Sequence, residues 1–320
     1  MLVQEYAAAY VEEKHTIRQN GNFVGWLFLS MIAVQTVVKT LVGLGAFSGL
    51  VSLLGTHEGV MVLNMILYVV QLAVPCVAVA MIAGRRQTPF PTKRVRGGIW
   101  FVGLFGGMAL AIVANLVSGW LMEWLTTFGI PEPDLPETVL PTYSSLAVNL
   151  LSTAVLPAFI EEMIFRGYML GTLRRHGDGF AVVVTAVFFG VFHGNVLQMP
   201  FAVILGLALG YLTVITDCIW PAVLLHFSNN AMAVLLSFFE QRFPDNTTEI
   251  NGITFLVVAM IGTIVLTVLL HGRETIRPIG NRYSTLRMSE QVWTLLSSPV
   301  LVVAEVLMIL TLVQSMGGAA

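Results

Sequence analysis

Long runs of apolar residues, separated by short polar segments, recur along the whole chain. A helix needs about 17 to 25 apolar residues to cross the hydrocarbon core of a bilayer. Only 11% of the 320 residues are charged, whereas soluble domains carry about 25% charged residues. The sequence therefore predicts an all-α protein, a polytopic transmembrane helix bundle of eight or nine spans that forms one domain over residues 1–320.

The apolar runs give the bounds of the expected spans. The runs that begin at Phe180 and Pro200 are short, so they are either two crossings or a re-entrant pair. Nine runs qualify, and they are Phe23–Leu44, Val60–Ala83, Ile99–Thr126, Ser144–Leu173, Phe180–Val196, Pro200–Ile215, Ile219–Phe239, Ile253–Leu270 and Val292–Val313.

Basic residues are concentrated in alternate loops between the expected spans. They lie before the first span and in the loops that contain Arg94, Arg174 and Arg287, while the intervening loops are acidic, as around Asp134 and Asp245. Loops rich in Lys and Arg stay in the cytoplasm. We therefore predict a cytoplasmic N-terminus and a C-terminus outside. The formal net charge of -2 provides no field that would attract nucleic acid, so the expected surroundings are membrane lipids.

Charged residues in the middle of one expected span are the first candidates for function. The segment AFIEEMIFRGYML places Glu161, Glu162 and Arg166 far from either end of the Ser144–Leu173 run. A charged residue inside a membrane is costly and by default indicates a functional site with a nearby partner. Glu162 and Arg166 are four residues apart and share a helix face, so they can neutralise one another. Glu161 points about 100° away and is left to face other groups.

Two later spans supply groups that Glu161 can face. In FFGVFHGN, Phe189 and His193 share a helix face, and in LLHFSNN, His226 and Asn230 share another. At about 1.5 Å per residue, all these polar groups lie roughly 14 to 20 Å from the cytoplasmic ends of their spans. A carboxylate, two imidazoles and an amide at one depth can deprotonate water and stabilise an oxyanion, or bind a divalent metal.

Structural explanations compete with the chemical one. Glu162 and Arg166 can form only a buried brace, and His226 and Asn230 can simply join helices by hydrogen bonds. A non-catalytic membrane scaffold, an immunity protein or a transporter would also carry polar residues at mid-depth. A transporter should show repeated halves, and the sequence contains no such repeat.

Taken together, the three motifs resemble those of the CAAX prenyl protease and bacteriocin-processing family, also called abortive-infection-type intramembrane proteases. The resemblance covers about a quarter of the chain, Leu156–Leu236, within the expected core at 144–240. The family's EExxxR matches Glu161, Glu162 and Arg166, its FxxxH matches Phe189 and His193, and its HxxxN matches His226 and Asn230.

The resemblance implies an intramembrane endopeptidase that hydrolyses a peptide bond of a membrane-associated protein or peptide, with or without an attached lipid. Glu161 and His193 would activate the water, and His226 and Asn230 would stabilise the oxyanion. Structural support would come from Glu162, Arg166 and Phe189.

The family is also described as metallopeptidases, so a metal is an alternative. Glu161, His193 and His226 could be three zinc ligands, with water as the fourth. We favour a reaction without a cofactor, because the sequence lacks HExxH and a water activated by glutamate needs no metal.

One expected contact lies outside the motifs. Lys39 and Glu305 are each the only formally charged residue of their apolar runs, and an unpaired charge inside the bilayer is costly. Counted from Phe23 and Val292, they lie at similar depths, about 24 and 20 Å. We therefore expect an ion pair that joins the first and last spans as neighbours.

Overall fold

The computed structural model describes residues 2–84, 91–129, 140–271 and 284–317. Every regular element in these ranges is a helix, which confirms the predicted all-α class. The elements are α1 (Leu2–Gly43), α2 (Ser48–Leu54), α3 (His57–Ile82), α4 (Gly97–Thr126), α5 (Tyr143–Asn149), η1 (Leu150–Val155), α6 (Leu156–Glu162), η2 (Met163–Leu170), α7 (Gly171–Leu173), η3 (Arg174–His176), α8 (Asp178–Phe192), α9 (Gln198–Thr216), α10 (Trp220–Arg242), η4 (Pro244–Asn246), α11 (Thr247–His271), α12 (Met288–Leu296) and α13 (Pro299–Gly317).

Seven helices of the described residues are long and apolar enough to cross a membrane, or eight if the bent pair α12 and α13 forms one span. The chain is thus an integral, multi-pass membrane protein. The expected span Phe180–Val196 is shorter than predicted, because α8 has 15 residues and ends at Phe192. Two of the loops whose charges predict the orientation lie largely outside the described residues, at 130–139 and 272–283.

The expected final span Val292–Val313 is not a single helix. α12 and α13 meet at an angle of 80°, because Pro299 has no N–H with which to continue the hydrogen-bond pattern of α12. α1 passes close to this bend. A Cβ atom on Gly21 would lie 2.1 Å from Ser298 Oγ, and one on Gly25 would lie 2.5 Å from the Leu301 nitrogen. Only glycine fits at these two positions.

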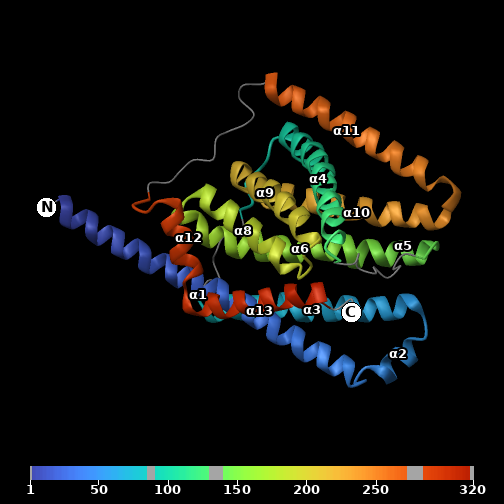
Figure 1. The fold of residues 1–320 in the computed structure, drawn as a ribbon, viewed down its shortest axis with the longest axis horizontal. Helices are drawn as coiled ribbons and strands as arrows, with labels where there is room; N and C mark the ends of the chain where they lie inside the picture. Colours follow the sequence, from blue (N-terminus) through green and yellow to red (C-terminus); the bar gives the residue numbers. More distant parts are fainter. Residues whose placement is uncertain (1, 85–90, 130–139, 272–283, 318–320) are drawn as a thin grey trace.

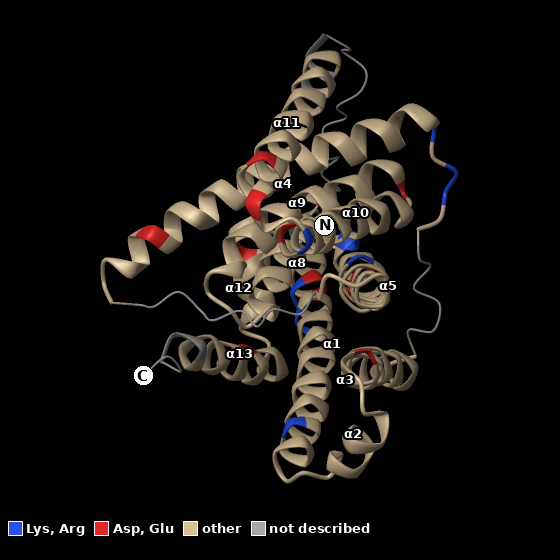
Figure 2. Ribbon diagram, turned by 90° about the vertical axis from the view of Figure 1, so that its right-hand side faces the viewer, with Lys and Arg blue, Asp and Glu red and all other residues tan. Residues whose placement is uncertain are grey.

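The helices are arranged in three groups (Figure 1). α1, α3 and α13 lie on one side, α4 and α11 lie on the other, and the segment from α5 to α7 lies between them with α8, α9 and α10. Charged residues are sparse along these helices (Figure 2). The side chains of Glu161 and Glu162 in this central segment are buried.

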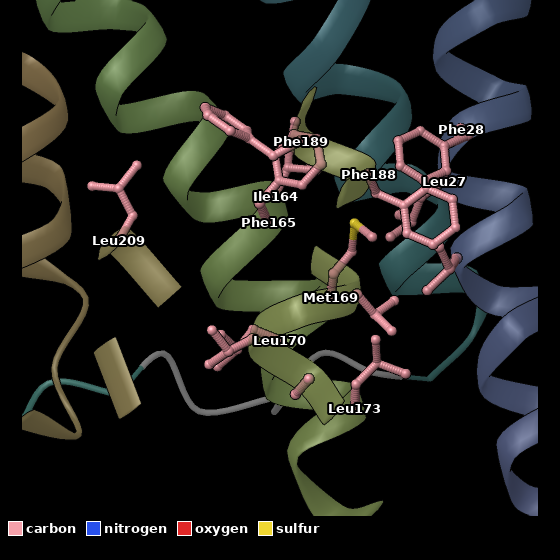
Figure 3. Packing of buried hydrophobic residues seen from close by; sticks show 14 of the residues in the cluster. Leu27, Phe28, Ile164, Phe165, Met169, Leu170, Leu173, Phe188, Phe189 and Leu209 are labelled. Carbon is pink, nitrogen blue, oxygen red and sulfur yellow. The ribbon is translucent and has the colours of Figure 1, made fainter. Parts of the chain in front are cut away.

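Aromatic side chains fix the central segment between its neighbours (Figure 3). The ring of Phe165 in η2 lies 6.2 Å from that of Phe28 in α1 and 5.1 Å from that of Phe189 in α8, measured between ring centroids. Phe28 also contacts Phe188 of α8, at 5.3 Å. Aromatic pairs of this kind add about 0.5–1.5 kcal/mol each. The packing holds η2 at a defined rotation.

The predicted ion pair between Lys39 and Glu305 is wrong, although α1 and α13 are neighbours as expected. Lys39 is exposed, and no described ion pair contains it or Glu305. The bend explains the error. Gly25 lies against Leu301, and the two helices run in the same direction, so Glu305 is level with a residue ten positions before Lys39. That offset is about 15 Å along the helix.

A polar cluster joins two loops at the end of the bundle that we predict to be cytoplasmic. Asp217, in the turn between α9 and α10, forms ion pairs with Lys93 at 2.6 Å and with Arg174 at 2.8 Å. The Lys93 backbone N–H also donates to the Asp217 carbonyl oxygen at 3.0 Å. The hydrogen bond from Lys93 is the largest cause of a lowered pKa of Asp217, with Arg174 acting in the same direction and partial burial opposing both.

The Asp217→Asn substitution should destabilise the protein at neutral pH and much less in acid. Because the pKa of the folded carboxyl is lowered, its stabilisation is complete above the unfolded value of about 3.9 and is lost as the pH falls through the folded value. The side chain is 35% exposed, so we expect an effect of no more than about 1 kcal/mol. Asparagine tolerates the left-handed backbone here, where φ is 48°. Thermal melts in detergent from pH 7 to pH 3 test this. A difference in melting temperature between Asp217→Asn and the wild type that is as large at pH 3 as at pH 7 would contradict it.

Candidate active site

The two glutamates lie in a short α-helix between two π-helical turns. α6 ends at Glu162, and η1 and η2 flank it. Such turns occur often at functional sites. Pro157 contributes to the irregularity, because it has no N–H to donate to the Thr153 carbonyl one turn earlier. The Asn230 side-chain amide donates to that carbonyl at 3.0 Å instead, so α10 is joined to the segment just before the glutamates.

Glu162 contacts two cationic or polar partners at once. Its Oε1 atom accepts a hydrogen bond from Arg166 Nη1 at 2.8 Å, and His226 Nδ1 lies 2.9 Å from the same oxygen. Arg166 also donates from Nη2 to the Gly206 carbonyl at 3.0 Å. Glu162 and Arg166 are fully buried. The ion pair expected from their spacing is present. Glu162 also orients His226, which the sequence predicts to face Glu161.

Glu161 contacts Tyr68, which Glu162 does not, and it shares His226 with Glu162. Its Oε1 atom accepts a hydrogen bond from the Tyr68 hydroxyl of α3 at 2.7 Å. Its Oε2 atom is buried without a hydrogen-bond partner among the described residues, and it lies 3.9 Å from His226 Nε2. One water molecule can hydrogen-bond to both atoms across such a gap.

The ring of Phe189 is the centre around which the other side chains pack. The imidazoles of His193 and His226 lie edge-on to it, with ring centroids at 4.9 and 5.6 Å. The Arg166 guanidinium lies over the same ring, 4.6 Å from its centroid. Phe189 therefore holds three of the polar groups at fixed angles, which is a packing role.

Both histidines have one nitrogen occupied. His193 Nδ1 lies 2.7 Å from the Phe189 carbonyl oxygen, and a carbonyl can only accept, so Nδ1 carries the proton. His226 Nδ1 likewise donates to the Glu162 carboxylate. In a neutral ring the other nitrogen, Nε2, is then an acceptor. The local hydrogen bonds thus define which atom of each histidine is available for chemistry.

The structure brings only some of the candidate residues into direct contact. Glu161, Glu162, Arg166 and His226 are linked by the contacts above, and His193 joins them through Phe189. The amide of Asn230 bonds to Thr153 and accepts from Asn229 at 3.1 Å, and it has no described contact with the glutamates or histidines.

Tyr68 was missed in the sequence analysis. The sequence does contain an indication of its role. Tyr68 lies within the apolar Val60–Ala83 run, and a buried phenol usually has a hydrogen-bond partner. The partner could not be identified, because nothing in one sequence shows which helix packs beside α3.

The alternative set of zinc ligands, Glu161, His193 and His226, is not arranged as a metal site here. Across the ranges that the structure describes, no three His, Cys, Asp or Glu side chains form a group that could hold a metal ion.

The fold and the site define a multi-pass membrane protein with carboxylates and imidazoles buried inside its helix bundle. Residues 143–232 match the family model described as type II CAAX prenyl endopeptidase Rce1-like. This match contains all three motifs and confirms the resemblance to the CAAX protease family. No curated protein and no solved structure matches the chain.

Tyr68→Phe tests the contact that the structure adds to the site. Hydrogen bonds to charged groups contribute about 1.5–3 kcal/mol, and about 1.4 kcal/mol is a factor of ten in rate. We therefore expect kcat for peptide hydrolysis to fall at least about tenfold with little change in KM. Tyr143→Phe is the control, because Tyr143 is 78% exposed on α5. Equal kcat values for Tyr68→Phe and the wild type would show that the phenol does not position Glu161.

Proposed function

We propose that the protein is an intramembrane endopeptidase that hydrolyses a peptide bond by means of a water activated by Glu161. One observation carries the proposal. Glu161 Oε2 is buried without a hydrogen-bond partner in the described residues, and it faces His226 Nε2 at 3.9 Å. A buried carboxylate oxygen is costly to leave unpaired, so Oε2 is suited to accept a hydrogen bond from the attacking water, next to His226.

In the proposed reaction, Glu161 removes a proton from the water as its oxygen attacks the carbonyl carbon of the peptide. His193 Nε2 accepts a hydrogen bond from the same water and orients it. The proton on Glu161 then passes to the nitrogen of the leaving amine as the carbon–nitrogen bond breaks. Tyr68 holds the other oxygen of Glu161 throughout.

Stabilisation of the oxyanion is assigned to His226 and Asn230. His226 must carry both protons to donate from Nε2, and the carboxylate of Glu162 at 2.9 Å from Nδ1 is placed to neutralise that charge. Asn230 has a second amide proton beyond the one donated to Thr153. Loss of one oxyanion donor costs about 10² to 10³ in kcat in other hydrolases.

The proposed substrate is a peptide or protein that reaches the site through the membrane, with or without a lipid attached. The family description names prenyl endopeptidases, and the depth of the site inside an apolar bundle agrees with a membrane-bound substrate. We place the N-terminus in the cytoplasm and the C-terminus outside, from the distribution of basic residues.

A library of fluorogenic peptides, with and without a prenyl group, tests the proposal on the purified protein in detergent and in liposomes. Hydrolysis by the wild type and none by Glu161→Gln is the expected result. Cleavage that is equal for both proteins would contradict the proposed role of Glu161. A folded wild-type protein that cleaves no peptide of the library would favour a scaffold function.

Metal removal separates the two possible mechanisms. We expect activity to survive exhaustive treatment with EDTA and phenanthroline, because a water activated by Glu161 needs no metal. Elemental analysis of the active protein should find no stoichiometric metal. Loss of activity that zinc alone restores would contradict this expectation.

A further inference from the structure

A cavity lies between α8, α12 and α13, away from the candidate active site. Its volume is about 240 Å³, and its lining is apolar except for Glu305. Val187 of α8 and Ile309 of α13 line it and are 46% and 55% exposed. The cavity is therefore a groove that opens towards the surroundings of the helix bundle.

This groove does not share a face with the active site. On α8, Val187 and Val191 line the groove, and each is two residues from Phe189. Two residues correspond to about 200° around an α-helix, so these valines point away from the side on which Phe189 contacts the histidines. A ligand in the groove would not touch the catalytic groups.

Among the described residues, no group forms an ion pair with Glu305 or a hydrogen bond with its Oε1 atom. It is the only formally charged residue of α13. Its Oε1 atom is buried without a hydrogen bond, and no described Lys, Arg or His forms an ion pair with it. Lys39 of the neighbouring helix α1 is offset from the level of Glu305 by about 15 Å along α1. A carboxyl group in apolar surroundings without a donor is costly.

The depth of Glu305 limits what can supply the missing donor. α12 meets α13 at 80°, and its Trp293 is 73% exposed, which is typical of an aromatic residue at the membrane interface. Glu305 is six residues beyond Pro299, or about 9 Å along α13. Lipid headgroups lie outside the hydrocarbon core, and lipid tails have no donors. A donor carried into the apolar region on a protein segment can reach Glu305 there.

We infer that this groove binds a transmembrane helix of a partner protein that carries a lysine or arginine, which pairs with Glu305. At about 30 Å³ for each water molecule, the cavity has the volume of roughly eight waters, enough for one long basic side chain. Val187 and Ile309 provide apolar contacts for the partner helix on either side. Polar pairs between helices inside a membrane are a known means of association.

Binding of synthetic helices to the full-length protein in phosphatidylcholine liposomes tests the inference. One peptide is a twenty-residue Leu/Ala helix with a single lysine six residues from one end, and the matched peptide has leucine there. Energy transfer from labelled protein to labelled peptide gives the affinity. We expect the lysine peptide to bind at least tenfold more tightly, with the difference abolished in Glu305→Gln and retained in the control Glu123→Gln, whose side chain is exposed on α4.

Three results would overturn the inference. They are equal affinities of the two peptides for the wild type, an unchanged preference in folded Glu305→Gln, and displacement of the lysine peptide by phosphatidylethanolamine, which would assign the groove to a lipid amine. If Glu305→Gln does not fold, Val187→Phe narrows the groove and leaves the carboxylate in place. Val187→Phe should weaken the lysine peptide at least tenfold, and wild-type affinity there would also refute the proposal.

Discussion

Glu161→Gln is expected to lower kcat/KM for peptide hydrolysis by at least about 10²- to 10⁴-fold, the usual contribution of a general base. Glutamine has the same shape and can still accept the hydrogen bond from Tyr68, but its amide cannot take a proton from water. His193→Ala and His226→Ala should cause similar losses. Initial rates on the best peptide from the library give the comparison.

Two controls keep this prediction specific to the site. Glu123→Gln removes an exposed carboxylate of α4 and should leave the rate unchanged. The Glu161→Gln protein should also melt within a few degrees of the wild type, which shows that folding is intact. Normal turnover by a folded Glu161→Gln protein would remove Glu161 from the mechanism.

Arg166→Met is expected to destabilise the protein by about 3–5 kcal/mol, the usual cost of removing one partner of a buried ion pair. The substitution leaves the Glu162 carboxylate buried beside His226, and it deprives the Gly206 carbonyl of a donor. Thermal unfolding in detergent measures the effect. We expect the substitution to lower stability more than the rate of peptide hydrolysis. The rate should fall only to the extent that His226 loses its fixed position.

Arg242→Met is the matched control, because Arg242 lies at the end of α10 without a described ion pair. Surface substitutions of this kind change stability by about 0.5 kcal/mol or less. A double variant, Glu162→Gln with Arg166→Met, removes both charges and should recover part of the lost stability. A melting temperature of Arg166→Met equal to that of the wild type would show that the pair contributes nothing.

The parts of the site that depend on spacing within one helix could be predicted from the sequence. Glu162 and Arg166 contact each other because residues four apart share a face, and the structure contains that ion pair. The same rule separated Glu161 from them. The family match at residues 143–232 includes every motif that had been chosen from charge and periodicity.

The parts of the site that depend on contacts between helices could not be predicted from the sequence. His226 bonds to Glu162, and Tyr68 bonds to Glu161, because of how α10 and α3 pack against α6. The depth of Glu305 was estimated from helix rise on the assumption that Val292–Val313 is one straight helix. The bend between α12 and α13 makes that estimate wrong.

The short length of α8 bears on the sidedness of the whole chain. Its 15 residues extend about 22 Å, less than the roughly 30 Å of the hydrocarbon core, and Gly194, with φ of 63°, lies in the turn towards α9. If α8 and α9 enter and leave on one side, they add no net crossing, and if both cross fully, they add two. The parity of crossings is the same in both cases. His193 can therefore lie just beyond a helix that ends within the bilayer, and a re-entrant α8–α9 pair by itself leaves the predicted sides of the two termini unchanged.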